Sequence, residues 1–163
     1  MKQYLTYLFL YSAIACHFRT DNKKLSGILK MPSFKILSID SATCINSDNI
    51  PFGSSTVFMY FDPTCEHCER EARAISRNIT ALKKAKIYLV SNDTSKEVNQ
   101  FYIRNRLDTI MNVFVGKDYN FSFYRAFLPP TVPYMAIYNS KKKLVKLYKG
   151  ETNIESIINA TQD

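Results

Sequence analysis

A Cys-x-x-Cys motif stands where the sequence changes from a strand-like to a helix-like pattern, and this placement constrains the fold most. Residues 56–61 (Thr-Val-Phe-Met-Tyr-Phe) form a continuous apolar run, which is typical of a central strand covered on both faces. Asp62-Pro63 ends the run, and Cys65-Glu66-His67-Cys68 follows. From Cys65 to Lys84 the apolar residues recur in steps of four and three, which predicts an amphipathic helix. These residues are Cys68, Ala72, Ile75, Ile79 and Leu82.

A pair of cysteines at the start of a helix is suited to disulfide exchange for three reasons. Helical spacing brings both sulfurs to the same end of one helix. Cys65 lies where free backbone N–H groups and the helix dipole favour a thiolate, which is the species that attacks a disulfide. Cys68 lies one turn later, within the apolar stripe, and is therefore shielded. We expect Cys65 to attack and Cys68 to resolve.

The two residues between the cysteines act on the Cys65 thiolate in opposite directions. His67 can donate a hydrogen bond or a positive charge to it, whereas Glu66 adds a nearby negative charge. Both are therefore candidate tuning residues, and the redox potential does not follow from the sequence. A purely structural disulfide between Cys65 and Cys68 is the alternative in an exported domain.

Strand-like and helix-like segments alternate along the rest of the chain. Residues 34–39 and 43–45 predict an N-terminal hairpin, and residues 86–91 predict a second buried strand. Thr94-Ser95-Lys96-Glu97 is a capping box that opens a helix. The remaining expected elements are a short strand over 111–115, a short aromatic helix over 119–127, a hairpin of strands 134–138 and 144–149, and a terminal helix opened by Thr152-Asn153-Ile154-Glu155.

Two segments of this pattern resemble the thioredoxin superfamily. Residues 58–68 (Phe-Met-Tyr-Phe-Asp-Pro-Thr-Cys-Glu-His-Cys) are similar to its active-site strand, loop and helix, and Thr131-Val132-Pro133-Tyr134 is similar to its cis-proline loop. The resemblance implies a three-layer α/β/α fold with a central mixed sheet, here with an N-terminal β-hairpin extension. It also implies that Pro133 is cis beside the dithiol, and that the backbone of Val132 pairs with the substrate chain as an added strand.

Within that superfamily, the exported, membrane-anchored reductases of the TlpA and ResA type are most similar. They share the N-terminal hairpin and the insertion between central strand and helix. Thr64 stands where many members have Trp, and Met59 stands where thioredoxins proper bury a carboxylate that moves protons for the second cysteine. The proton acceptor therefore stays open between Asp62 and Glu66, although Asp62 is more simply a helix cap ahead of Pro63.

The N-terminus has the features of an export signal. Lys2 supplies a positive charge, residues 5–15 are mostly apolar, and Ala13-Ile14-Ala15 supplies small residues at the positions that a signal peptidase reads. With Cys16 next, the segment resembles a bacterial lipobox, in which the cysteine is acylated. We expect a signal peptide in residues 1–15, a polar tether in 16–27 and a thioredoxin-like domain in 28–163. Ordinary cleavage after Ala15 and a retained membrane anchor are the alternatives.

Export would place the domain in the cell envelope, anchored to the membrane and facing the periplasm, where disulfides form and persist. The resemblance then implies a thiol-disulfide oxidoreductase that serves cell redox homeostasis. Its expected partners are protein dithiol or disulfide substrates and an upstream membrane electron donor, and the resemblance favours reduction. The Cys65–Cys68 disulfide is the only redox group required, so we expect no dissociable cofactor.

The chain has 163 residues, of which 46% are apolar, so one well-buried domain is expected. Its 22 Lys and Arg against 14 Asp and Glu give a net charge of +8, which suits anionic lipid, an acidic partner or nucleic acid. Nucleic acid is the least suitable of these, because the basic residues are scattered and no nucleic-acid-binding motif contains them.

Two other activities would use the same residues. Cys65, His67 and Cys68 could hold Cu(I) or Zn(II), as in copper-delivery relatives of the fold, but these relatives need a further histidine downstream, and the chain has only His17 and His67. We therefore expect no metal site. A peroxiredoxin would need a Pro-x₃-Thr-x₂-Cys pattern, whereas Pro63 and Thr64 are adjacent here.

Two further features have simple structural interpretations. Cys44 lies in the predicted hairpin, and we expect it to be buried as a small apolar residue. Lys141, Lys142 and Lys143 are expected to form the solvated tip of the second hairpin.

Overall fold

Strand β3 (Thr56–Tyr60) lies inside the sheet, and all five of its residues are buried. Its side chains alternate between two cores, because Val57 and Met59 pack into one and Phe58 and Tyr60 into the other. The parallel strand β4 (Lys86–Ser91) and the antiparallel strand β6 (Tyr134–Tyr138) flank it. The apolar run at 56–61 therefore forms a central strand, as expected.

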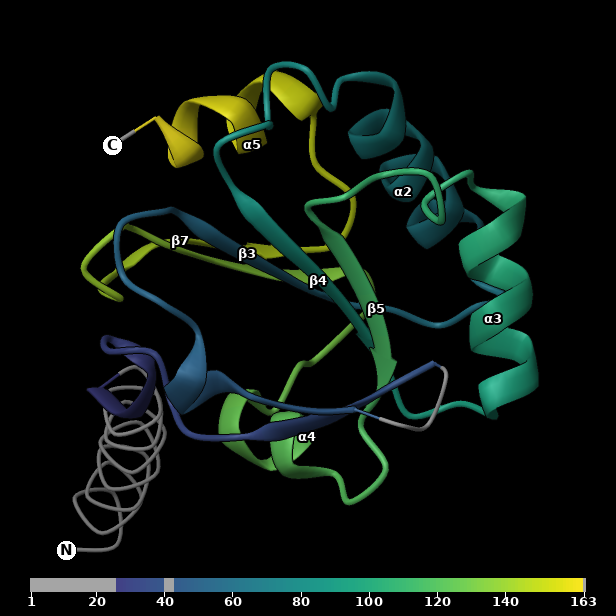
Figure 1. The fold of residues 1–163 in the computed structure, drawn as a ribbon, viewed down its shortest axis with the longest axis horizontal. Helices are drawn as coiled ribbons and strands as arrows, with labels where there is room; N and C mark the ends of the chain where they lie inside the picture. Colours follow the sequence, from purple (N-terminus) through teal and green to yellow (C-terminus); the bar gives the residue numbers. More distant parts are fainter. Residues whose placement is uncertain (1–25, 40–42, 163) are drawn as a thin grey trace, which may run out of the picture.

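The computed structural model describes residues 26–39 and 43–162 (Figure 1). Seven strands form one sheet in the order β2-β1-β5-β4-β3-β6-β7. Strands β3, β4 and β5 are parallel neighbours, and the other neighbouring pairs are antiparallel, so the sheet is mixed as expected. The strands not yet named are β1 (Lys35–Ser38), β2 (Cys44–Asn46), β5 (Val113–Lys117) and β7 (Leu144–Lys149).

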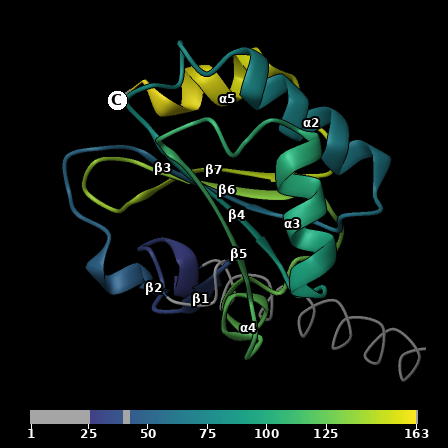
Figure 2. The ribbon, with the colours of Figure 1, turned by 45° about the vertical axis from the view of Figure 1, so that its right-hand side comes forward.

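Helices cover both faces of the sheet and make three layers (Figure 1; Figure 2). Helices α2 (Glu66–Arg77), α3 (Ser95–Arg104) and α5 (Ile154–Thr161) pack on one face over an aliphatic core. Helix α4 (Ser122–Phe127) packs on the other face with the N-terminal segment, over a core rich in aromatic rings. The three-layer arrangement with an N-terminal hairpin on β5 confirms the expected fold class.

Helix α2 ends seven residues before the predicted end at Lys84. Asn78 is the C-cap of the helix: its backbone N–H donates to the Ala74 carbonyl at 3.1 Å, and its side-chain amide donates to the same carbonyl at 2.9 Å. Residues 78–85 instead form successive turns, in which Leu82 N–H donates to the Ile79 carbonyl. The apolar stripe continues through these turns, since Leu82 is buried and Ile79 packs against the same core.

The predicted burial of Cys44 is wrong. Cys44 is an exposed, free thiol. Strand β2 lies at the edge of the sheet and pairs with β1 alone, so its residues are covered on fewer sides than those of a central strand.

The predicted solvated tip at 141–143 is wrong for its middle lysine. Lys142 is buried, and its ammonium donates to the carbonyls of Ser47 and Asp48 at 3.3 and 3.0 Å. It also lies 4.9 Å from the centre of the Phe52 ring. Lys142 therefore fastens the β6–β7 hairpin to the segment after β2, while Lys141 and Lys143 are exposed.

The expected signal peptide at 1–15, and Cys16 with most of the tether, lie outside the described residues. Ile28 is buried, and its carbonyl accepts a hydrogen bond from the Tyr138 hydroxyl at 3.0 Å. The boundary at residue 28 stays a prediction. Among the residues that the structure describes, no helix is both long enough and apolar enough to span a bilayer.

Candidate functional site

Cys65 occupies the N-cap position of helix α2, directly after the loop that leaves β3. Its N–H donates to the Asp62 carbonyl at 3.1 Å, which closes a turn before the helix. The Asp62 carboxylate accepts hydrogen bonds from the backbone N–H and the hydroxyl of Thr64, both at 2.7 Å. Asp62 therefore caps this turn rather than the helix, and Cys65 occupies the N-cap position of the helix instead.

The two cysteines differ in exposure as the sequence predicts. Cys65 is partly exposed and Cys68 is fully buried, and both are free thiols. Burial raises the pKa of the Cys68 thiol far above its ordinary value, and the backbone N–H of Asp62 offsets only part of this effect. The nearby Cys65 side chain raises the Cys68 pKa further. The arrangement provides one accessible sulfur with a protonated partner behind it.

The Val132-Pro133 peptide bond is cis, as the resemblance implies. Pro133 is buried, and Val132 packs against the same core as Cys65. The carbonyl of Pro133 accepts a hydrogen bond of 2.8 Å from the N–H of Gly150, whose φ of 91° suits glycine. The cis-proline loop is thereby joined to the loop that follows β7.

That loop brings a carboxylate to the dipeptide between the cysteines. Glu151 Oε2 lies 2.7 Å from His67 Nδ1, and Arg70 donates to both oxygens of the same carboxylate, at 2.8 and 2.9 Å for its shortest bond to each. The hydrogen bonds from Arg70 and then from His67 lower the pKa of Glu151 to about 2. The negative charge on Glu151 therefore holds His67 in place at the surface.

Arg70 also places a positive charge near the reactive sulfur. Its guanidinium interacts electrostatically with Cys65, and it lies 3.9 Å from the exposed carboxylate of Glu66. The sequence predicts the Glu66–Arg70 pair, because the residues are four apart on a helix. It does not predict Glu151, because that residue lies 84 positions from His67 and only the tertiary fold joins the two.

Glu71 is the most unusual side chain of helix α2. It is 2% exposed, and neither carboxylate oxygen makes a hydrogen bond of ordinary geometry within the described part of the chain. Burial raises its pKa to about 8, although the backbone N–H of Thr152 partly counters the effect. The sequence contains a pattern that indicates this burial, since Glu71 lies three residues after Cys68 and four before Ile75, on the apolar face of the predicted helix.

No group of three or more His, Cys, Asp or Glu side chains within residues 26–39 and 43–162 is arranged to hold a metal ion. His67 is bound to Glu151 and Arg70 at the surface, while Cys68 is buried beneath the helix start. His17 lies outside the described residues.

No protein-family model matches the chain, and no curated protein sequence matches it. Solved structures do match. A secreted Mycobacterium tuberculosis disulfide oxidoreductase homologous to Escherichia coli DsbE superposes with a TM-score of 0.67 at 14% identity, covering 78% of this chain and 93% of its own. M. tuberculosis DsbF has a TM-score of 0.68 at 14% identity, with 83% and 95% covered.

StoA from Bacillus subtilis is also similar, with a TM-score of 0.63 at 18% identity over 80% of this chain and 96% of that one. The chain therefore has the thioredoxin-like α/β fold of these structures, one of which is a secreted disulfide oxidoreductase.

Proposed function

We propose that this protein is a thiol-disulfide oxidoreductase that exchanges disulfides with protein substrates through Cys65 and Cys68. The observation that carries the proposal is the pair of free thiols at the start of α2, one accessible and the other buried beside it. The cis Val132-Pro133 bond and the fold shared with disulfide oxidoreductases support it. The reaction needs no dissociable cofactor.

In the reductive direction, the Cys65 thiolate attacks one sulfur of a substrate disulfide. A mixed disulfide forms, and the other substrate sulfur leaves as a thiolate that takes up a proton. Cys68 then loses its proton and attacks the Cys65 sulfur, which releases the second substrate thiolate. Two electrons pass to the substrate, and the protein is left with a Cys65–Cys68 disulfide.

The scheme requires a proton acceptor for Cys68, and we propose Glu71 rather than Asp62, whose charge also acts on the Cys68 thiol. The Asp62 carboxylate is held by Thr64, and the Glu66 side chain is exposed beside Arg70. Glu71 follows Cys68 by one turn on the buried side of α2, and its pKa of about 8 lets it take up and release a proton near neutral pH.

The sequence features of residues 1–16 also indicate where in the cell the protein acts. An export signal and an acylated Cys16 would anchor the domain to the membrane on its periplasmic side, with residues 16–27 as a tether. The protein then acts as a reductase that receives electrons from a membrane dithiol donor. The donor converts the Cys65–Cys68 disulfide back to two thiols.

Three cysteine variants test the proposal. Cys65→Ser removes the attacking sulfur, so reduction of insulin by dithiothreitol should no longer be accelerated. Cys68→Ser retains attack but lacks the resolving sulfur, so mixed disulfides with substrates should accumulate and be visible on non-reducing gels of the native host. Cys44→Ser is the matched control, because Cys44 is exposed and lies on the edge strand β2.

The control should have the activity of the unmodified protein. Equal activity of all three variants would contradict the proposal, and so would trapping of partners on Cys44 rather than Cys65. Mass spectrometry of the trapped partners, from hosts with and without an intact Cys16, checks whether the anchor selects the substrates.

A further inference from the structure

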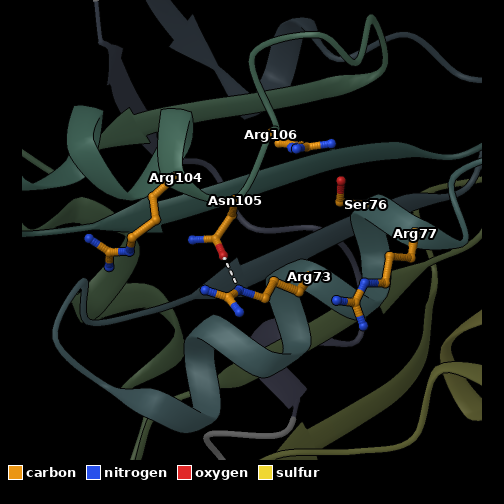
Figure 3. A pocket seen from close by; sticks show the side chains of 6 residues that line it. All are labelled: Arg73, Ser76, Arg77, Arg104, Asn105 and Arg106. Atoms are coloured by element: carbon orange, nitrogen blue, oxygen red, sulfur yellow. Dashed lines mark hydrogen bonds between the residues drawn. The ribbon is translucent and has the colours of Figure 1, made fainter.

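Four arginines line a groove of about 530 Å³ between α2 and the turn that follows α3 (Figure 3). Helix α2 contributes one wall and the end of α3 the other, so the side chains come from two elements. The groove is shallow and open to solvent. Its lining residues are Arg73, Ser76 and Arg77 on one wall, and Arg104, Asn105 and Arg106 on the other.

The positive charge of the groove is largely uncompensated. One carboxylate, that of Glu69, pairs with Arg73 and Arg104. Within the described residues, Arg77 and Arg106 have no ion pair or side-chain hydrogen bond. Four guanidinium groups against one carboxylate repel one another, and an anion in the groove would relieve this repulsion.

The favourable interaction of a cation with a helix C-terminus explains only some of these arginines. Arg77 and Arg104 lie in the last turns of α2 and α3, where a cation suits the helix dipole. Arg106 lies beyond α3 with a φ of 54°, at the position after a helix where glycine or asparagine is usual. An arginine at this strained position adds charge to the groove without serving the helix.

The carboxylate of Glu69 already pairs with two of the arginines that line the groove. It bridges Arg73 and Arg104, and it lies 3.2 Å from Arg104 Nε. Partial burial opposes its ionisation, but the hydrogen bond from Arg73 and the charge of Arg104 outweigh burial and lower its pKa. Two of the groove's arginines therefore already bind a carboxylate of the chain itself, with the planar forks that suit carboxylates.

The groove begins beside the active-site loop. Arg104 Nη2 donates to the carbonyl of Pro63 at 3.1 Å, two residues before Cys65. Arg73 and Arg77 follow Cys65 by eight and twelve residues, which is about 12 and 18 Å along the helix. An extended chain crosses this distance in about four to six residues.

We propose that this arginine groove binds an acidic segment of the protein substrate, located about four to six residues from the substrate cysteine that Cys65 attacks. The inference rests on the proposed function and assigns its substrate class. Guanidinium groups on both walls of the groove (Figure 3) match several carboxylates along one chain. A lipid surface is flat, whereas the groove is concave.

Two synthetic peptides test the proposal with the reduced protein. Each has one cysteine in a mixed disulfide with thionitrobenzoate, then a four-residue Gly-Ser spacer, then either four Glu or four Gln. Attack by Cys65 forms the protein–peptide disulfide and releases thionitrobenzoate, which is measured by absorbance. At low salt the Glu peptide should react about tenfold faster than the Gln peptide, and 0.5 M salt should abolish the difference.

The double variant Arg77→Gln/Arg106→Asn should reduce the rate ratio to about one. Asn is chosen at 106 because it tolerates left-handed backbone. The matched control is Lys141→Gln/Lys143→Gln, which removes the same charge from the exposed hairpin tip and should preserve the ratio. Circular dichroism checks that both variants are folded.

A ratio of one in the unmodified protein would overturn the proposal, as would a ratio that the double variant preserves. Inhibition by inorganic phosphate beyond that of chloride at equal ionic strength would assign the groove to a phosphate ligand instead. Binding to phosphatidylglycerol vesicles that the double variant loses, without any rate ratio, would assign it to lipid. If the Gln peptide does not react at all, the proposed dithiol function fails rather than the docking site.

Discussion

Glu71 places an ionisable carboxylate in the buried face of α2, where packing is favourable but a negative charge is not. The side chain fills space on the buried face of α2, but its carboxylate has no hydrogen bond of ordinary geometry to a described residue. A buried carboxylate of this kind is neutral over a wider pH range than an exposed one. Its presence three residues after Cys68 favours a chemical role over a packing role, since an apolar residue would be more stable there.

Glu71→Gln should remove a pH dependence from the free energy of unfolding. The pKa of Glu71 is raised from 4.5 to about 8. Below pH 4.5 the group is protonated in both states, and between pH 4.5 and 8 it ionises only in the unfolded state, so stability falls as pH rises. The variant should gain up to about 4 kcal/mol relative to the unmodified protein between pH 4.5 and 9.

Urea unfolding at four pH values over this range measures the effect, with exposed Glu155→Gln as the control. Parallel pH profiles for the Glu71 variant and the unmodified protein would show that the carboxylate is not buried. If Glu71 accepts the Cys68 proton, the same variant should also slow resolution of the mixed disulfide by about 10- to 100-fold, measured by stopped flow.

Helix α4 depends on one buried carboxylate at its start. Asp118 is fully buried, and its two oxygens accept the backbone N–H groups of Phe123 and Tyr124 at 3.0 and 2.9 Å. These groups have no partner within the helix, because they lie in its first turn. The aromatic pattern of residues 119–127 predicts the helix, and the structure adds the cap that starts it three residues later, at Ser122.

Asp118→Ala should reduce the free energy of unfolding by about 2–4 kcal/mol, because two charge-assisted hydrogen bonds are lost and the N–H groups remain buried. The loss should be local as well as global, so the amides of α4 should exchange hydrogen faster than those of α2. Asp108→Ala, at an exposed position, should change stability by less than about 0.5 kcal/mol. Equal protection of α4 in both variants would argue against the cap.

The N-terminal hairpin joins the rest of the molecule where β1 lies against β5. Gly116 of β5 pairs with Ser38 of β1, and an added Cβ at Gly116 would lie 2.6 Å from the Leu37 carbonyl oxygen. Backbone atoms cannot move aside as a flexible side chain can. The close approach at Gly116 therefore sets how the hairpin attaches to the sheet.

Gly116→Ala should destabilise the protein by about 1–3 kcal/mol, since β1 and β5 must separate to admit the methyl group. The matched control is Gly27→Ala, where no atom lies within 4 Å of the added Cβ. Thermal unfolding followed by circular dichroism compares the two. A destabilisation of the same size in both variants would mean that loss of glycine, rather than contact with Leu37, is responsible.

Much of the site could be predicted because its signals are local. The apolar run before Cys65 and the steps of four and three after it depend on neighbours in the chain, and the structure has the corresponding strand and helix. The resemblance to thioredoxins implied the cis bond at Pro133, and the structure has it as well. The predicted end of α2 was wrong, because periodicity does not show that Asn78 caps the helix.

The amino-acid sequence alone determined the order of most strands and helices and the position of the dithiol at a helix start, since periodicity and turn residues act over a few positions. The thioredoxin-like fold class followed from the resemblance of two motifs. Only the tertiary structure decided that Glu71 is buried, that Glu151 reaches His67 and that Cys44 is exposed. It also decided that the arginines of α2 and α3 meet in one groove. The physical reason is that burial and charge pairing depend on which distant segments the fold brings together.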